Sequence, residues 1–106
     1  MSETIILTSK VAAEGGGLLM LADSLVSGDG SPGILFVGDG VYSLLEGSES
    51  QRILTSRHPS LKLFGCQEDL QARGIADKVS WPAEILDYEG IVRLIMRHAS
   101  KVVSYL

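Results

Sequence analysis

Apolar runs of strand length alternate along this chain with glycine-containing turns and with segments of helical period. Thr4 to Thr8 encloses a continuous aliphatic run, which suits a strand buried on both faces of a sheet. Ile34 to Val37 and Leu61 to Cys66 are further apolar runs. Two shorter strands are expected at Ala83 to Leu86 and at Lys101 to Tyr105. The pattern therefore predicts a sheet of four or five strands.

Helices are predicted between these runs. Leu18 to Val26 repeats leucine and alanine at helical spacing. Gln67 to Arg73 has acids first and arginine last, as the helix dipole prefers, and Gly74 follows as a left-handed C-terminal residue. Asp87 is a typical N-cap for a last helix. The apolar face of that helix would consist of Tyr88, Ile91, Val92, Ile95 and Ala99.

The middle of the chain has a weaker pattern. Gly38-Asp39-Gly40 is expected to turn the chain after a strand, and Val41 to Leu45 is expected to form one or two helical turns closed by Gly47. Gly47 to Ser60 is polar and has no sustained period, so we expect a loop or an irregular helix there.

The alternation of strands and helices predicts an α/β fold with a compact, mostly parallel four- or five-stranded sheet flanked by helices. The chain has 106 residues, of which 45% are hydrophobic and 21% charged, as in one packed domain. We therefore expect a single domain over residues 1–106. A chain of this size has considerable surface for its volume, which favours oligomerisation.

The net charge and the length of the apolar runs limit the kinds of function that the chain can have. A net charge of −4 opposes direct binding of nucleic acid, and the basic residues near the C-terminus are few. Their expected role is a solvated helix face on which Glu89 supports Arg93. The longest apolar run, Leu18 to Ala22, is too short to span a bilayer. One cysteine cannot form an internal disulfide, and no signal peptide is evident, so we expect a cytoplasmic protein.

Metal, cofactor and hydrolase chemistry find no support in the residue types. His58 and His98 have no partners at ligand spacing, and one cysteine cannot build a typical zinc site. Nothing in the sequence places His58 beside Cys66 as a catalytic base. No metal and no cofactor are therefore expected.

Cys66 is the main candidate for chemistry, because it ends a predicted strand and precedes a predicted helix. Amide N–H groups at a helix start favour the thiolate, which is the form of cysteine that attacks sulfur. Glu68 and Asp69 oppose a second negative charge there, so we expect only modest activation. The alternative is that Cys66 is an inert, buried core residue.

The turn Gly38-Asp39-Gly40 is a second, weaker candidate. It follows a strand and would open a helix, which is the right place for an anion. Asp39 would repel a phosphate, and no third glycine follows in the spacing that dinucleotide sites use. A small anionic ligand at Gly38, Asp39 and Gly40 is therefore one alternative function.

Three segments together resemble the DsrE/DsrF/DsrH-like sulfur-relay family, and most closely its DsrH/TusB branch. They are ILFVGDGVYSLLEG from Ile34 to Gly47, LKLFGCQEDLQARGI from Leu61 to Ile75, and ILDYEGIVRLIMRHASKVVSYL from Ile85 to Leu106. The resemblance implies a DsrEFH-like α/β fold and persulfide transfer between cysteines. It also implies partners of the DsrE/DsrF or TusC/TusD type, in tRNA wobble 2-thiouridine synthesis or in sulfur oxidation.

The resemblance leaves the role of the cysteine open. In the DsrE branch the active cysteine ends a strand and precedes an Arg-Gly step at the spacing seen between Cys66 and Arg73-Gly74, so Cys66 is a candidate persulfide carrier of sulfurtransferase type. DsrH and TusB proteins commonly lack a cysteine there, and some have one in the first helix, where this chain has Leu18, Leu19 and Met20. The alternative is a non-catalytic structural or regulatory subunit.

Overall fold

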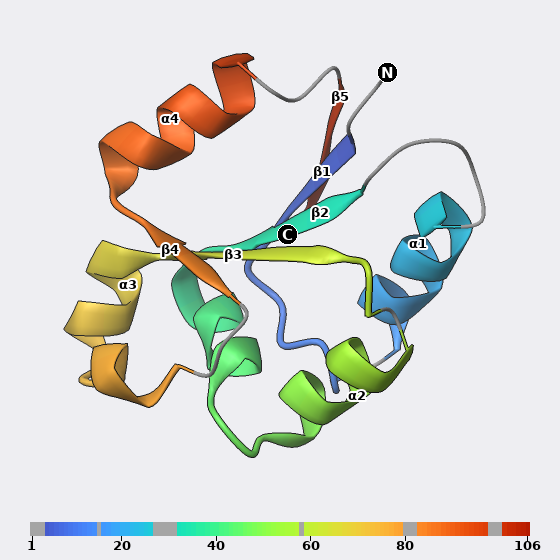
Figure 1. The fold of residues 1–106 in the computed structure, drawn as a ribbon, viewed down its shortest axis with the longest axis horizontal. Helices are drawn as coiled ribbons and strands as arrows, with labels where there is room; N and C mark the ends of the chain where they lie inside the picture. The colour runs from blue at the N-terminus through green and yellow to red at the C-terminus, as the bar shows by residue number, and fades with distance from the viewer. Residues whose placement is uncertain (1–3, 15, 27–31, 58, 80–82, 98–100) are drawn as a thin grey trace.

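The computed structural model describes residues 4–14, 16–26, 32–57, 59–79, 83–97 and 101–106. Within these residues, five strands form one sheet in the order β4-β3-β2-β1-β5, and neighbouring strands are parallel (Figure 1). The strands are β1 (Thr4–Thr8), β2 (Gly33–Phe36), β3 (Lys62–Cys66), β4 (Glu84–Leu86) and β5 (Lys101–Tyr105). The predicted parallel α/β sheet is therefore confirmed.

The helices cover the two faces of the sheet unequally. In Figure 1, α1, α2 and α3 lie on one side of the sheet together with the 3-10 helix η1, and α4 lies on the other side. The helical elements are α1 (Gly17–Val26), η1 (Gly38–Leu44), α2 (Glu49–Arg57), α3 (Gln67–Ala72), η2 (Ala76–Lys78) and α4 (Tyr88–Arg97). The face opposite α4 therefore carries most of the helical cover.

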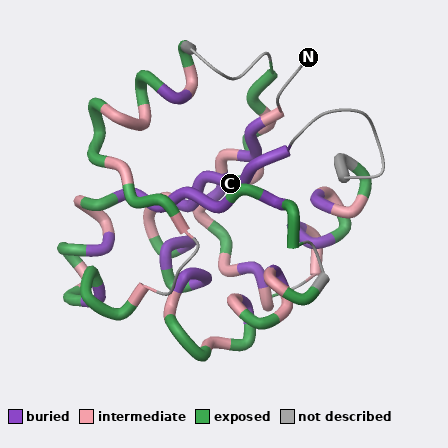
Figure 2. Tube along the Cα trace, viewed as in Figure 1, coloured by how far each residue is buried: buried purple, intermediate pink, exposed green. Residues whose placement is uncertain are grey.

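Two hydrophobic clusters follow from this arrangement. The larger one includes Ile6, Ile34 and Leu63 and packs against α1, α2 and α3. The smaller one consists of Ile5, Leu35, Phe64 and Leu94, the last of which comes from α4. Adjacent residues such as Ile5 and Ile6 enter different clusters because side chains alternate across a strand. Figure 2 shows the central strands as buried and most of α4 as exposed or intermediate.

The prediction of a loop or irregular helix over Gly47 to Ser60 is wrong for most of that segment, because Glu49–Arg57 is the regular helix α2. Ser48 caps the helix by accepting the Gln51 N–H at 3.1 Å. The buried face of α2 contains Leu54 and also Ser50, whose hydroxyl accepts the Ala13 N–H at 2.8 Å. A polar residue on the buried face therefore hid the helical period.

Two further helix predictions need correction. The helix predicted from Val41 begins at Gly38 instead and is of the 3-10 type, so the predicted turn forms its first residues. The predicted apolar face of α4 is wrong in part, because Ile91, Leu94 and Ile95 pack on the sheet whereas Tyr88 and Val92 are exposed. Ala99 lies outside the described residues. The reason is that the sheet reaches only one side of α4.

Leu54→Ala should lower the free energy of unfolding by about 2–5 kcal/mol, because a fully buried leucine on α2 would leave a cavity in the larger cluster. Urea unfolding followed by circular dichroism measures the change. The exposed neighbour Arg52 provides the control, and Arg52→Ala should change the free energy little. Equal effects of the two substitutions would contradict the amphipathic packing of α2.

Candidate functional site

Cys66 is the last residue of β3 and the N-cap residue of α3, as the sequence predicts. The strand ends of β2, β3 and β4 lie at the same edge of the sheet, so Cys66 lies near the Gly38 turn and the start of α4. The side chain is fully buried, with 0% exposure, and packs in the larger hydrophobic cluster. The thiol is thus at the expected edge but out of contact with solvent.

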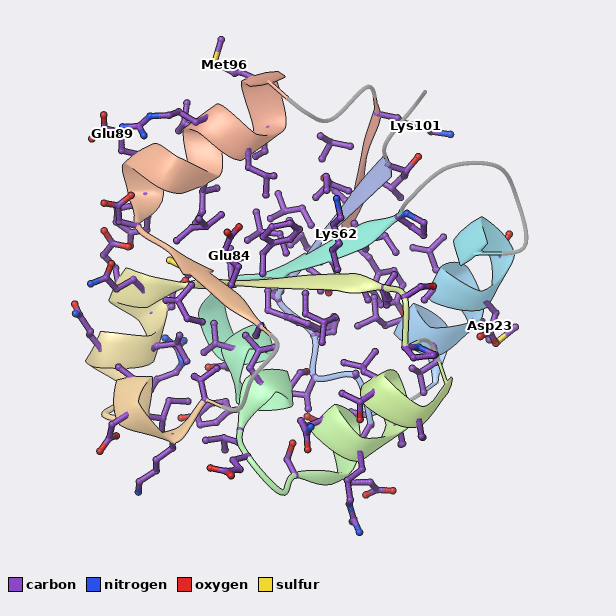
Figure 3. All side chains as sticks on the ribbon, in the orientation of Figure 1. Asp23, Lys62, Glu84, Glu89, Met96 and Lys101 are labelled. Atoms are coloured by element: carbon purple, nitrogen blue, oxygen red, sulfur yellow. The ribbon has the colours of Figure 1, made fainter. Side chains whose placement is uncertain are left out.

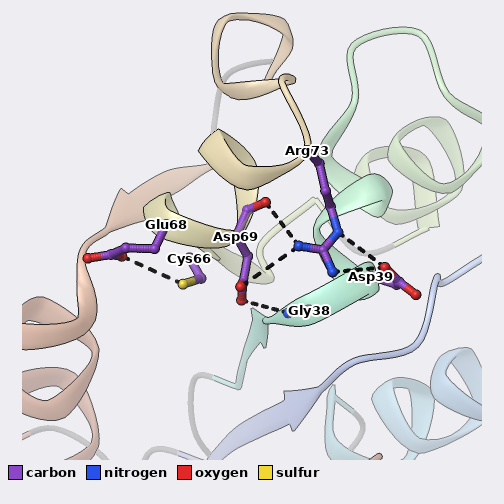
Figure 4. A network of polar contacts seen from close by, with 6 residues as sticks. All are labelled: Gly38, Asp39, Cys66, Glu68, Asp69 and Arg73. Atoms are coloured by element: carbon purple, nitrogen blue, oxygen red, sulfur yellow. Dashed lines mark hydrogen bonds and ion pairs between the residues drawn. The ribbon is translucent and has the colours of Figure 1, made fainter.

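Glu68 joins the thiol to the start of α4. The Cys66 thiol donates to Glu68 Oε1 at 3.7 Å (Figure 4), and the Tyr88 N–H donates to Glu68 Oε2 at 3.2 Å. Asp87 caps the same helix by accepting the Gly90 N–H at 2.7 Å, so the predicted N-cap is confirmed. One carboxylate therefore holds both the thiol and the first turn of α4.

The environment favours the neutral thiol. Burial is the main cause that raises the pKa of the Cys66 thiol to about 11, and the Asp69 carboxylate raises it further. The backbone amides of Asp69 and Glu68 act in the opposite direction, as expected at a helix start. Burial outweighs them, so the expected modest activation of the thiol is wrong for this conformation.

A second polar network ties the Gly38 turn to α3 (Figure 4). Asp69 Oδ2 accepts the Gly38 N–H at 2.7 Å. Arg73 donates from Nε and Nη2 to Asp39 Oδ1 at 3.1 and 2.9 Å, and from Nη1 to the Asp69 carbonyl oxygen at 3.1 Å. Asp39 in turn raises the pKa of Arg73. The Asp69 carboxylate is therefore bound by a backbone amide, and the Asp39 carboxylate is bound by the Arg73 guanidinium.

Backbone conformation and close packing explain why glycine occupies positions 38 and 40 of the turn. Gly38 has a positive φ of 53°, which favours glycine. A Cβ atom on Gly40 would lie 2.9 Å from the Thr8 carbonyl oxygen, because η1 packs closely on the end of β1. The Gly38 N–H, one donor that an anion would need, is already bound to Asp69. The ligand role of Gly38, Asp39 and Gly40 therefore stays a prediction that requires displacement of Asp69.

Sequence reasoning missed two participants in this region. The sequence predicts Arg73 only as a helix end and as part of an Arg-Gly step, whereas in the structure it also pairs with Asp39 of η1. The helical period predicts Tyr88 on the apolar face of α4, yet the side chain is largely exposed. The Asp69 charge is the main cause that raises the pKa of its phenol, followed by partial loss of solvent and by Cys66 and Glu68. Asp39 and Arg73 are 34 residues apart, so no short stretch of the sequence indicates that they pair.

Metal and membrane features are absent from the part of the chain that the structure describes. No group of three or more His, Cys, Asp or Glu side chains there could hold a metal ion. His58 and His98 lie outside the described residues. No described helix is long and apolar enough to cross a bilayer.

Comparison with known proteins places the chain in a family. A family profile described as "DsrH like protein" matches residues 18–101, which is most of the chain. The chain belongs to the DsrH-like family. A "Protein TusB" from Photorhabdus laumondii is 37% identical over 65 residues, covering 61% of this chain and 66% of that protein. A "Protein TusB" from Escherichia coli (strain Crooks) is 33% identical over 70 residues, covering 66% of this chain and 72% of that protein.

Solved structures show the same fold for this DsrH-like chain. The crystal structure of the ychN protein from E. coli aligns with a TM-score of 0.77 at 19% identity, over 99% of this chain and 100% of that chain. A protein of unknown function from Methanobacterium thermoautotrophicum aligns with a TM-score of 0.70 at 17% identity and the same coverage. At these identities the likeness concerns the fold.

Cys66 should be alkylated by iodoacetamide at pH 7 at least about a hundredfold more slowly than in the urea-unfolded chain. A pKa of about 11 instead of 9.0 leaves about a hundredth of the thiolate, and burial slows access further. The rate in the folded protein should keep rising with pH towards that pKa. An apparent pKa at or below 8 in the rate profile would contradict this environment.

The same raised pKa predicts a pH-dependent stability. The folded state holds the thiol proton more tightly than the unfolded state, so this contribution is complete below pH 9.0 and is lost as the pH rises towards about 11. Cys66→Ala lacks it, and the difference in unfolding free energy between the wild type and this variant should shrink over that interval. A constant difference would show that the thiol does not titrate differently in the two states.

Gly40→Ala should lower the free energy of unfolding by about 1–3 kcal/mol, because the new Cβ would press on the backbone of Thr8 and Ser9. Urea unfolding measures the loss. Ser56→Ala, at an exposed position on α2, serves as the control and should be nearly neutral. A neutral Gly40→Ala would mean that the glycine serves something other than close packing.

Proposed function

We propose that this chain is a subunit of a sulfur relay, working in the cytoplasm with subunits of the DsrE/DsrF or TusC/TusD type. Membership of the DsrH-like family is the observation that carries the proposal. The relatives named TusB favour thiolation of the tRNA wobble uridine over sulfur oxidation as the pathway. With a net charge of −4, contact with the tRNA itself would fall to other subunits.

Within this relay, the Sγ atom of Cys66 is proposed to carry the sulfur that is transferred. Its thiolate attacks the terminal sulfur of a donor persulfide, R–S–SH, and forms a new S–S bond. The S–S bond of the donor breaks, and R–S⁻ leaves with the electron pair of that bond. The product is Cys66–S–SH, and there is no net oxidation.

Two requirements follow from the geometry. The thiol must first lose its proton, and Glu68 Oε1, at 3.7 Å, is the carboxylate oxygen that can accept it. The sulfur must also become accessible, because Cys66 is fully buried. Movement at the start of α4, which Glu68 holds through the Tyr88 N–H, would meet the second requirement. A relay partner that binds there would allow transfer only inside the assembly.

The second candidate is a non-catalytic subunit that completes the assembly without handling sulfur. The burial of Cys66 and the raised pKa of its thiol favour this candidate for the isolated chain. The two candidates differ in one respect, which is whether Cys66 ever receives a sulfur atom.

Mass spectrometry after incubation with a persulfide donor separates them. Because Cys66 is the only cysteine, added sulfane sulfur on the wild-type chain and none on Cys66→Ser would identify the carrier atom. We expect little loading of the isolated chain and clear loading when co-expressed relay subunits are present. No sulfur on Cys66 in either condition, with the partner subunits loaded in the same sample, would leave the non-catalytic subunit.

A further inference from the structure

The Glu68 carboxylate lies between the buried thiol of Cys66 and the start of α4. Exposure rises outward through three residues, because Cys66 is fully buried, Glu68 is half-buried and Tyr88 is 59% exposed. Each carboxylate oxygen has its own donor, the thiol for Oε1 and the Tyr88 N–H for Oε2. Figure 4 shows the contact between the Glu68 side chain and the sulfur. The carboxylate therefore covers the sulfur and also holds the first turn of α4.

A second sulfur atom on Cys66 would need the place that this carboxylate occupies. The thiol donates to Glu68 Oε1 at 3.7 Å, so its hydrogen points at that oxygen. A persulfide sulfur replaces this hydrogen on Sγ at an S–S distance of about 2.05 Å, which would leave it less than about 2 Å from Oε1. Non-bonded atoms do not approach so closely. An anionic persulfide would also be repelled by the carboxylate charge.

Other directions around the thiol offer the added sulfur no easier place. Cys66 packs in the larger hydrophobic cluster, and an atom added to a close-packed interior displaces its neighbours. An anionic sulfur there would lose its water without gaining a partner. The Asp69 carboxylate, whose charge raises the pKa of the thiol, would repel the anion from another side. Movement of the half-buried Glu68 side chain is the smaller change.

We infer that Glu68 is a lid on Cys66, and that a sulfur atom added to Cys66 displaces this lid and frees the first turn of α4. The Tyr88 N–H then loses its acceptor, while Asp87 still caps the helix through the Gly90 N–H. By linkage, a ligand that holds the start of α4 away from Glu68 favours loading of Cys66 by the same factor by which loading favours that ligand. The use of this coupling in sulfur transfer rests on the relay function proposed above, whereas the coupling itself does not.

In a relay, the lid would report whether the chain carries sulfur. A sulfur carrier meets its donor while it is empty and its acceptor while it is loaded. The empty chain has its Tyr88 N–H bound to Glu68, and the loaded chain would have it free. A protein at the start of α4 could therefore distinguish the two states without touching the buried sulfur.

Three substitutions of Glu68 separate cover from charge. Glu68→Ala removes both, Glu68→Asp keeps the charge on a side chain too short to span both donors, and Glu68→Gln keeps the shape without the charge. For a lid, alkylation of Cys66 by iodoacetamide at about pH 8 should be about fivefold or more faster than in the wild type for the alanine and aspartate variants. The glutamine variant should change little, because the Asp69 charge that raises the pKa of the thiol stays in place.

Glu89→Ala is the matched control. Glu89 is also an acid in the first turn of a helix and directly follows Tyr88, but Figure 3 shows it on the side of α4 that points away from the sheet. The substitution removes only an exposed ion pair with Arg93, so Cys66 should be alkylated as in the wild type. Circular dichroism checks that each variant folds.

The reverse direction uses a synthetic sulfur extension and needs neither a persulfide donor nor a relay subunit. At about pH 10, where about a tenth of the thiol is ionised, the Cys66 thiolate attacks the sulfenyl sulfur of S-methyl methanethiosulfonate. An S–S bond forms to give Cys66–S–S–CH3, and methanesulfinate leaves with the electron pair of the broken S–S bond. Mass spectrometry confirms the label.

Amide hydrogen exchange, followed by NMR at about pH 7, then gives the readout. The Tyr88 N–H should exchange about threefold or more faster in the labelled chain, because it loses its acceptor. The Gly90 N–H, bound to Asp87 in the same turn, should keep its rate. In Glu68→Ala the Tyr88 N–H should exchange fast before labelling, and the label should add little.

Three results would overturn the inference. Alkylation of Glu68→Ala at the wild-type rate would show that Glu68 does not cover the thiol. Equal acceleration in Glu68→Gln and Glu68→Ala, with none in Glu68→Asp, would assign the effect to charge. An unchanged exchange rate of the Tyr88 N–H on labelling would show that the added sulfur lies elsewhere. These results are independent of persulfide loading, which tests the relay function separately.

Discussion

The carboxylate of Asp69 holds together the edge of the sheet on which the candidate site depends. It accepts the Gly38 N–H that follows β2, and it belongs to the first turn of α3 that follows β3. Parallel strands end at the same edge of the sheet, but the hydrogen bonds between the strands do not fix the position of the segments that follow them. Asp69 and Arg73 supply that connection, and Arg73 extends it to Asp39. Removing the Asp69 carboxylate would leave the Gly38 N–H in the turn without its acceptor. It would also remove one of the negative charges next to Cys66.

The chemistry at Cys66 is decided by which of two opposing effects is larger. Backbone amides at the start of α3 favour a thiolate, as they would at any helix start. Loss of water around a fully buried sulfur opposes it, and the acids of the same turn add to that opposition. Burial is the larger effect, so this conformation favours the neutral thiol, and the transfer proposed for Cys66 would require another conformation or a partner. The position of a cysteine in the fold is therefore a weaker guide to reactivity than its solvation.

Those features that depend on short stretches of chain could be predicted from the sequence. Continuous aliphatic runs marked β1 and β2, the Asp87 cap marked the start of α4, and Gly74 marked the end of α3. Features that depend on contacts between distant segments could not. The α2 helix was hidden because Ser50 lies on its buried face, where its hydroxyl accepts the Ala13 N–H from the loop after β1. The exposed side of α4 was hidden because periodicity gives the width of an apolar arc and says nothing of how much of it a sheet will cover.

The start of α4 connects the Cys66 site with the exposed side of that helix. Glu68 holds the Cys66 thiol with one oxygen and the Tyr88 N–H with the other, so the helix cannot shift at its first turn without disturbing the contact to the sulfur. Tyr88 also lies on the exposed side of α4, and its phenol is close enough to Cys66, Glu68 and Asp69 for their charges to raise its pKa. A protein that binds this side of α4 would therefore act on the environment of the thiol through the Glu68 carboxylate alone.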